Sequence, residues 1–215
     1  MSAIDAHQSE SAESALALSG PAMLEWSRVV DAVLRGLGHA LNNRAAALSA
    51  VIELSKDDDG GTEDILTTEL HRVRELAAVV RTMGRPRGGV EAFSPRDAAD
   101  EAQAVLALHA EQRDRVVLIE SAASTAVRVP KWMYVRALIA LIASIPARAG
   151  THSVRVTVDD RGEWIAVVAS DVPAVLETAS PFTTEVVRAM RGELLPDAYG
   201  FRLPSLAALR KREGR

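Results

Sequence analysis

The sequence predicts a fold in two parts, an all-α helical hairpin followed by an α+β sandwich. Three observations support this: residues 21–55 carry apolar side chains at helical spacing, a second helical pattern begins near Thr62, and the pattern becomes mixed beyond the Gly- and Pro-containing segment 84–89. The predicted boundaries are a loose leader over 1–20, the hairpin over 21–84, a linker over 85–90, the α+β domain over 91–206 and a tail over 207–215.

Each helix of the hairpin carries one apolar stripe. At about 100° per residue, the stripe of the first helix lies within roughly 40° of one line. Turn-forming Asp and Gly residues over 56–61 end this helix. Two single stripes do not close a core, so we expect a homodimer whose two hairpins form a four-helix bundle. The stripe residues are Trp26, Val30, Leu34, Leu37, Leu41, Leu48 and Ile52 in the first helix, and Leu66, Leu70, Val73, Ala77 and Val80 in the second.

The second part alternates between helical and strand-like patterns, with a predominantly antiparallel sheet expected. Ser94 followed by Pro95 is typical of a capped helix start. Alternating residues on either side of an Asp-Asp-Arg-Gly turn predict a β-hairpin. The expected order is strand, helix, strand, strand, helix, hairpin, helix, strand. The first strand precedes residue 95 and has no stated bounds; the other elements are helices over 95–111, 130–149 and 183–191, and strands over 115–120, 126–129, 154–158, 164–169 and 199–203.

Composition excludes several classes of protein. The 215 residues include no cysteine, which rules out disulfides, thiol catalysis and cysteine-bound zinc. A net charge of −4 gives no electrostatic reason to expect nucleic-acid binding. No apolar run approaches the roughly 18 residues that cross a membrane, and the N-terminus lacks the basic start of a secretory signal. We therefore expect a cytoplasmic protein without membrane or nucleic-acid partners.

One histidine has an unusual setting. His39 lies about 180° from the apolar stripe of the first helix, with Arg35 and Asn43 four residues to either side. Ala46 and Ala50 continue the same side with small residues, which suits the docking of another protein over the imidazole. An imidazole on an open helix surface can accept a phosphoryl group and pass it on. We call these five residues the His39 face.

The segment 38–43, Gly-His-Ala-Leu-Asn-Asn, resembles the phosphoacceptor box of histidine kinases. The likeness extends over about residues 23–206. The hairpin and its linker, followed by Phe-Ser-Pro over 93–95, resemble the dimerisation hairpin and the start of the ATPase-like domain of these kinases. Helix 137–147 looks like the helix that carries their metal-binding Asn, and segments 154–169 and 190–204 look like the strands around their nucleotide-binding turns.

Four departures from the kinase pattern argue against ATP binding. Ser144 or Ala140 stands where the resemblance places the Mg-binding Asn, and Asp171 has none of the glycines that accompany it in kinases. The Gly-rich lid is missing before the helix at 183, and Ala40 follows His39 where kinases place an acidic residue. We therefore expect no bound cofactor, with any Mg²⁺ supplied by a partner.

A kinase-shaped dimer that keeps its histidine but not its nucleotide site resembles bacterial histidine phosphotransferases of the ChpT type. The resemblance implies that His39 passes phosphate between receiver-domain aspartates in a two-component phosphorelay, with Arg35 neutralising charge and Asn43 holding the imidazole or a water. The implied partners are response-regulator receiver domains and an upstream hybrid histidine kinase. The alternatives are a non-catalytic pseudokinase scaffold and a receiver phosphatase that uses Asn43. Only Asp171 supports a further alternative, an ATP-dependent kinase.

Overall fold

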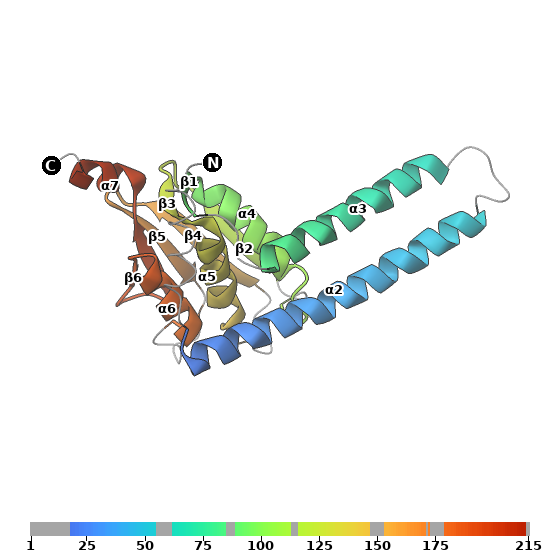
Figure 1. Cartoon of the computed structure of the whole chain (residues 1–215), viewed down its shortest axis with the longest axis horizontal. Helices are drawn as coiled ribbons and strands as arrows, with labels where there is room; N and C mark the ends of the chain where they lie inside the picture. The colour runs from blue at the N-terminus through green and yellow to red at the C-terminus, as the bar shows by residue number, and fades with distance from the viewer. Residues whose placement is uncertain are drawn as a thin grey trace.

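A long helical hairpin extends from one side of an α/β domain (Figure 1). The structure is a computed structural model, and it describes residues 18–54, 62–84, 89–112, 116–146, 153–170, 172 and 179–213. Most of the predicted leader, most of the predicted linker and Asp171 lie outside these residues. No helix in the described part of the chain is both long and apolar enough to cross a membrane.

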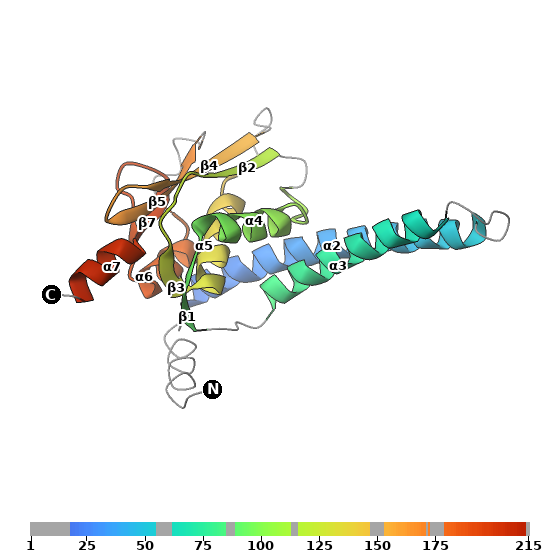
Figure 2. The same cartoon turned by 90° about the horizontal axis from the view of Figure 1, so that it is seen from above.

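The hairpin consists of α2 (Gly20–Leu54) and α3 (Thr62–Met83). The two helices run antiparallel and side by side, with the end of α2 and the start of α3 far from the α/β domain (Figures 1 and 2). The helices begin and end within two residues of the predicted positions, because the Asp- and Gly-rich turn and the Gly and Pro residues after α3 stop them where the sequence indicates.

Within one chain, most of the buried residues of the two helices lie beside the predicted stripes, and of the stripe residues only Leu37 is buried. Val33 and Val51 of α2 and Val79 of α3 are buried, and each lies beside the stripe of its helix. Most stripe residues have no cover, because α3 packs against α2 from one side only. The exposed stripe residues are Leu34, Leu41, Ile52, Leu66, Leu70 and Val80, with 38–56% of each accessible.

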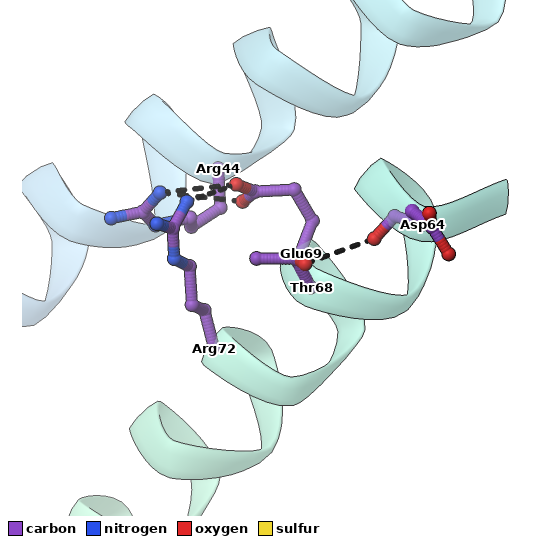
Figure 3. A network of polar contacts seen from close by, with 5 residues as sticks. All are labelled: Arg44, Asp64, Thr68, Glu69 and Arg72. Atoms are coloured by element: carbon purple, nitrogen blue, oxygen red, sulfur yellow. Dashed lines mark hydrogen bonds and ion pairs between the residues drawn. The ribbon is translucent and has the colours of Figure 1, made fainter. Parts of the chain in front are cut away.

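A buried carboxylate joins the two helices near the middle of the hairpin (Figure 3). Glu69 of α3 is only 4% exposed. Both of its oxygens lie 3.3 Å from Nη1 of Arg44 on α2, and Oε1 also accepts from Nη1 of Arg72 at 2.5 Å. Burial raises the pKa of Glu69, but the hydrogen bond from Arg72 and the charge of Arg44 outweigh it and leave the pKa below its ordinary value.

Glu69→Gln is expected to lower the unfolding temperature at neutral pH by about 5 °C, because the two guanidinium groups lose their anion. A lowered pKa means that the carboxylate stabilises the fold above its unfolded pKa, near 4.5, and that this contribution disappears as the pH falls through the lower folded value. Melting curves from pH 3 to pH 7 should therefore converge for wild type and variant at the acid end.

Glu75→Gln is the matched control for this prediction. Glu75 lies on the same helix but is exposed and pairs only with His71. Its replacement should change the melting temperature little at any pH. If the melting temperature of Glu69→Gln stays below that of wild type by the same amount down to pH 3, the charge of Glu69 does not stabilise the hairpin.

The α/β domain contains a five-stranded sheet in the order β2-β4-β5-β7-β6. Only the β2–β4 pair is parallel, so the expectation of a predominantly antiparallel sheet is confirmed. Helices α4, α5 and α6 lie on one side of this sheet (Figure 2), and β1 and β3 form a separate antiparallel pair. The strands are β1 (Val90–Phe93), β2 (Val116–Ser121), β3 (Val127–Pro130), β4 (Ser153–Asp160), β5 (Trp164–Ser170), β6 (Glu193–Leu194) and β7 (Gly200–Pro204). The helices are α4 (Pro95–Leu106), α5 (Lys131–Ala143), α6 (Pro181–Ala189) and α7 (Leu206–Glu213).

Three parts of the domain differ from the sequence prediction. Helix α4 ends at Leu106 rather than near 111, and residues 107–112 form turns that pack against α2. Helix α5 ends at Ala143, where the Ser144 hydroxyl bonds back to the Leu141 carbonyl, instead of continuing to 149. Much of the segment expected to be a tail is helix α7. Ser205 caps its start, since the Ser205 hydroxyl accepts the N–H of Ala208. Strand β1 is the expected first strand, whose bounds the sequence did not define, and strand β6 was not predicted.

The base of the hairpin is fastened to the α/β domain around one buried arginine. Arg136 of α5 lies between Trp26 and Trp132, with its guanidinium carbon 5.1 Å from each ring centroid. Its Nη2 donates to the carbonyl of Met83, the last residue of α3, at 3.3 Å, and to that of the next residue, Gly84, at 2.6 Å. Trp26 also stacks on Phe182 of α6 at 4.7 Å. These contacts place both helices of the hairpin against the same part of the domain.

Candidate functional site

The His39 face is open to solvent. All five of its residues, Arg35, His39, Asn43, Ala46 and Ala50, are exposed in the structure. They share one side of α2 because residues three or four apart in a helix lie one above the other. The structure therefore brings together the side chains that the sequence placed on this face.

The imidazole of His39 contacts the side-chain amide of Asn43. The amide nitrogen of Asn43 lies 3.3 Å from Nε2 of His39. With the amide donating, Nε2 is the acceptor and the ring proton is on Nδ1. In this tautomer, the lone pair of Nε2 faces the C-terminal part of the His39 face, where the small residues Ala46 and Ala50 leave room for a partner.

Arg35 forms a surface ion pair with the α/β domain. Its Nη2 lies 3.7 Å from Oε1 of Glu111, which belongs to the turn after α4. Both side chains are more than half exposed, so the ion pair is weak and exchangeable. The cationic group of Arg35 thus lies one helical turn before His39 and remains available to an incoming anion.

The turn formed by residues 107–112 borders the His39 face, which the sequence analysis did not anticipate. The N–H of Ala110 donates to the carbonyl of Ala32 at 3.1 Å, so the turn lies directly on α2. Its approach requires Gly36, since a Cβ at that position would be 1.7 Å from the carbonyl oxygen of Leu108. A glycine in the middle of a long helix was the sequence signal for this contact.

The two residues at the predicted position of the kinase Asn differ in exposure, and Ser144 is only half-buried. Ala140 is fully buried. The Ser144 hydroxyl donates to the carbonyl of Leu141 at 2.8 Å and lies 2.6 Å from the hydroxyl of Tyr199. Because the Ser144 hydroxyl donates to Leu141, the Tyr199 hydroxyl donates to Ser144, and burial raises the pKa of Tyr199. Among the described residues, no three His, Asp or Glu side chains come together to form a metal site.

No protein-family model matches the sequence, and no curated protein matches it. Solved structures of histidine kinases are similar to it. Acinetobacter baumannii histidine kinase AdeS is 12% identical over 78% of this chain and 96% of its own, with a TM-score of 0.41. A histidine kinase from Burkholderia phymatum STM815 is 14% identical over 88% and 100% of the two chains, with a TM-score of 0.41. Histidine kinase ThkA in complex with response regulator protein TrrA is 16% identical over 79% of this chain and 60% of its own, with a TM-score of 0.39.

Proposed function

We propose that this protein is a histidine phosphotransferase of a two-component phosphorelay. The observation that carries the proposal is the exposed imidazole of His39, whose Nε2 bonds to the amide of Asn43 on an otherwise open helix face. In the proposed reaction Nε2 attacks the phosphorus of a receiver-domain aspartyl phosphate. The N–P bond forms, the P–O bond to the aspartyl carboxylate breaks, and transfer to a second receiver runs the same step in reverse.

Each neighbour of His39 has a part in this reaction. Asn43 hydrogen-bonds to the Nε2 lone pair, which becomes free to attack when the incoming group displaces the amide. Arg35 offsets the negative charge of the phosphoryl group as it arrives. Ala46 and Ala50 form the flat surface on which the receiver domain docks. Receiver domains and an upstream hybrid histidine kinase are the proposed partners, and any Mg²⁺ comes with the receiver.

We also propose that the phosphoryl group does not come from ATP bound to the α/β domain. The hydroxyl of Ser144 is already engaged by Tyr199 and the Leu141 carbonyl. The domain is fastened to the hairpin around Arg136 and at Gly36, whereas a nucleotide carried on it would have to be brought across to His39. These contacts support a domain that braces α2, with the phosphoryl group supplied by a separate protein.

The exposed apolar stripes support a homodimer. Leu41 and Leu70 are each more than two-fifths exposed, although both are large apolar side chains on helices that pack together. A second hairpin would cover the stripes in a four-helix bundle and leave His39 outside, on the opposite side of α2. Each dimer would then present two separate phosphoacceptor sites.

Phosphotransfer from a radiolabelled, phosphorylated receiver domain tests the role of His39. Label should move to the wild-type protein, and His39→Ala should reduce the transfer at least 100-fold, because no other group replaces the nucleophile. His71→Ala is the matched control, since His71 is also exposed on the hairpin but pairs with Glu75. Equal labelling of wild type and His39→Ala, or label that remains on every receiver tried, would overturn the proposal and favour a non-catalytic scaffold.

The Asn43 amide also supports a second candidate function, dephosphorylation of a receiver. An exposed amide beside His39 can hold a water in line with an aspartyl phosphate. In the same labelling experiment, this activity would release free phosphate without a labelled intermediate. It would be lost in Asn43→Ala and retained in His39→Ala, the reverse of the pattern expected for phosphotransfer.

A further inference from the structure

The ion pair between Arg35 and Glu111 connects the His39 face to the α/β domain. Nη2 of Arg35 lies 3.7 Å from Oε1 of Glu111, and the two side chains are 60% and 69% exposed. Both residues line a groove of about 610 Å³ between α2 and the α/β domain, as do His109 and Glu25, and Arg35 is the last residue of α2 in this lining. The proposed phosphotransfer gives a part to Arg35 but none to Glu111.

The backbone around Glu111 is fixed, although its side chain is exposed. His109 is only 3% exposed, and its Nδ1 accepts the N–H of Glu111 at 3.3 Å. The carbonyl of His109 accepts the N–H of Gln112 at 2.9 Å. The N–H of Ala110 donates to the carbonyl of Ala32 on α2. The carboxylate of Glu111 is therefore attached to a turn that does not leave α2 unless these hydrogen bonds break.

Glu111 is the anion that Arg35 pairs with in the described part of the chain. The other carboxylates along the groove, Glu25 and Asp31, lie on α2 itself and form no ion pair with Arg35. Burial lowers the pKa of His109, so its ring is uncharged and adds no second cation beside Arg35. To contact a group on His39, one helical turn away, the guanidinium of Arg35 has to leave Glu111.

A phosphoryl group on Nε2 of His39 would compete with Glu111 for the guanidinium. A phosphoryl group carries up to two negative charges and can accept two parallel N–H bonds from an arginine. The distance of 3.7 Å between Arg35 and Glu111 is too long for a hydrogen bond, and exposed ion pairs of this kind are weak. The ion pair is therefore broken at a small cost, and this cost lowers the stability of the phosphorylated state.

We propose that Glu111 is a positioning residue for the phosphotransfer: it holds the guanidinium of Arg35 beside the His39 face and, by competing for it, weakens the retention of the phosphoryl group on Nε2. This inference rests on the proposed function. A relay protein has to release its phosphoryl group to the next receiver, so the competition keeps phosphorylated His39 from being a stable end point. The α/β domain thereby acts on the transfer through one carboxylate.

The equilibrium distribution of label between the full-length protein and a phosphorylated receiver domain tests this role. Glu111→Gln should shift the equilibrium toward phosphorylated His39 by about threefold, the effect expected from losing one exposed ion pair in the unphosphorylated state. Arg35→Ala should shift it toward the receiver. Glu193→Gln is the matched control, because Glu193 is also exposed and ion-paired, but with Arg202 of the sheet, and it should leave the equilibrium unchanged.

The double variant Arg35→Ala/Glu111→Gln separates positioning from a structural role. If Glu111 acts through Arg35, its replacement has no further effect once Arg35 is absent, and the double variant should match Arg35→Ala. The inference is overturned if Glu111→Gln leaves the equilibrium unchanged or shifts it toward the receiver. It is also overturned if the threefold shift persists in the double variant.

Chemical phosphorylation gives a second measurement that needs no receiver. Phosphoramidate transfers its phosphoryl group to imidazole as its P–N bond breaks and ammonia leaves, and the signal of His39 is identified by its absence in His39→Ala. In a phosphorus NMR titration, the pH at which this phosphoryl group takes up a proton should fall in Glu111→Gln, where Arg35 is free to approach it, and rise in Arg35→Ala. This order without any labelling by receivers would overturn the phosphorelay but not the role of Glu111. Labelling by receivers with no such order would overturn the role of Glu111 alone.

Discussion

Gly36→Ala is expected to destabilise the protein by about 2 kcal/mol, although alanine normally stabilises a helix interior by about 1 kcal/mol. A Cβ at position 36 would lie 1.7 Å from the carbonyl oxygen of Leu108 and 2.8 Å from its carbonyl carbon. Backbone atoms do not rotate away as a flexible side chain does. The turn at 107–112 or helix α2 must therefore move, and the hydrogen bond from Ala110 to Ala32 is lost with it.

Gly38→Ala is the matched control on the same helix. Nothing lies within 4 Å of a Cβ built at Gly38, so only helix propensity changes. This variant should be more stable than wild type, by up to about 1 kcal/mol. Chemical denaturation of the three proteins measures both effects. Equal stabilisation by Gly36→Ala and Gly38→Ala would contradict the close packing of the turn at 107–112 on α2.

Leu41→Glu is expected to convert the proposed dimer into a monomer. The new charge would be buried against the second hairpin, and an unpaired carboxylate in an apolar bundle is strongly disfavoured. The fold of the single chain should survive, because Leu41 is 43% exposed within it and contributes little to its own core. Light scattering coupled to size-exclusion chromatography gives the mass, and circular dichroism confirms that the helices remain.

Ala46→Glu is the corresponding change on the opposite side of α2. Ala46 belongs to the His39 face, so this variant should remain a dimer but transfer phosphate at least tenfold more slowly, because the charge obstructs the docking of the receiver. Each variant should therefore lose a different property, the dimer in Leu41→Glu and fast phosphotransfer in Ala46→Glu. A wild-type protein that is monomeric at micromolar concentration would contradict the dimer, and a dimer that survives Leu41→Glu would place its interface elsewhere.

The local pattern of the sequence was sufficient for the order of elements. The periodicity of α2 and α3, the Asp- and Gly-rich turn between them and the Ser-Pro start of α4 each depend on neighbours within a few residues. The exposure of His39 follows from the same periodicity. The bounds of β1 were left undefined and β6 was missed, because four and two residues carry too little pattern.

The lengths of α4 and α5 were overestimated for a different reason. Apolar residues continue past Leu106 and Ala143, but in the structure they belong to turns, and the turn after α4 packs on α2. Whether an apolar residue extends a helix or makes a tertiary contact depends on what lies opposite it. Periodicity does not contain that information.

The sequence by itself therefore determined the helical hairpin, the succession of elements that forms a mainly antiparallel sheet, and an exposed histidine with an amide one turn away. Only the tertiary structure decided which face of each helix is buried within a chain, that Arg136 and Gly36 hold the hairpin against the α/β domain, and that His109 and Glu25 line one groove. The physical reason is the separation, along the chain, of the residues that interact. Helix and strand patterns arise from neighbours along the chain, whereas burial, ion pairing and grooves arise between segments that are distant in sequence.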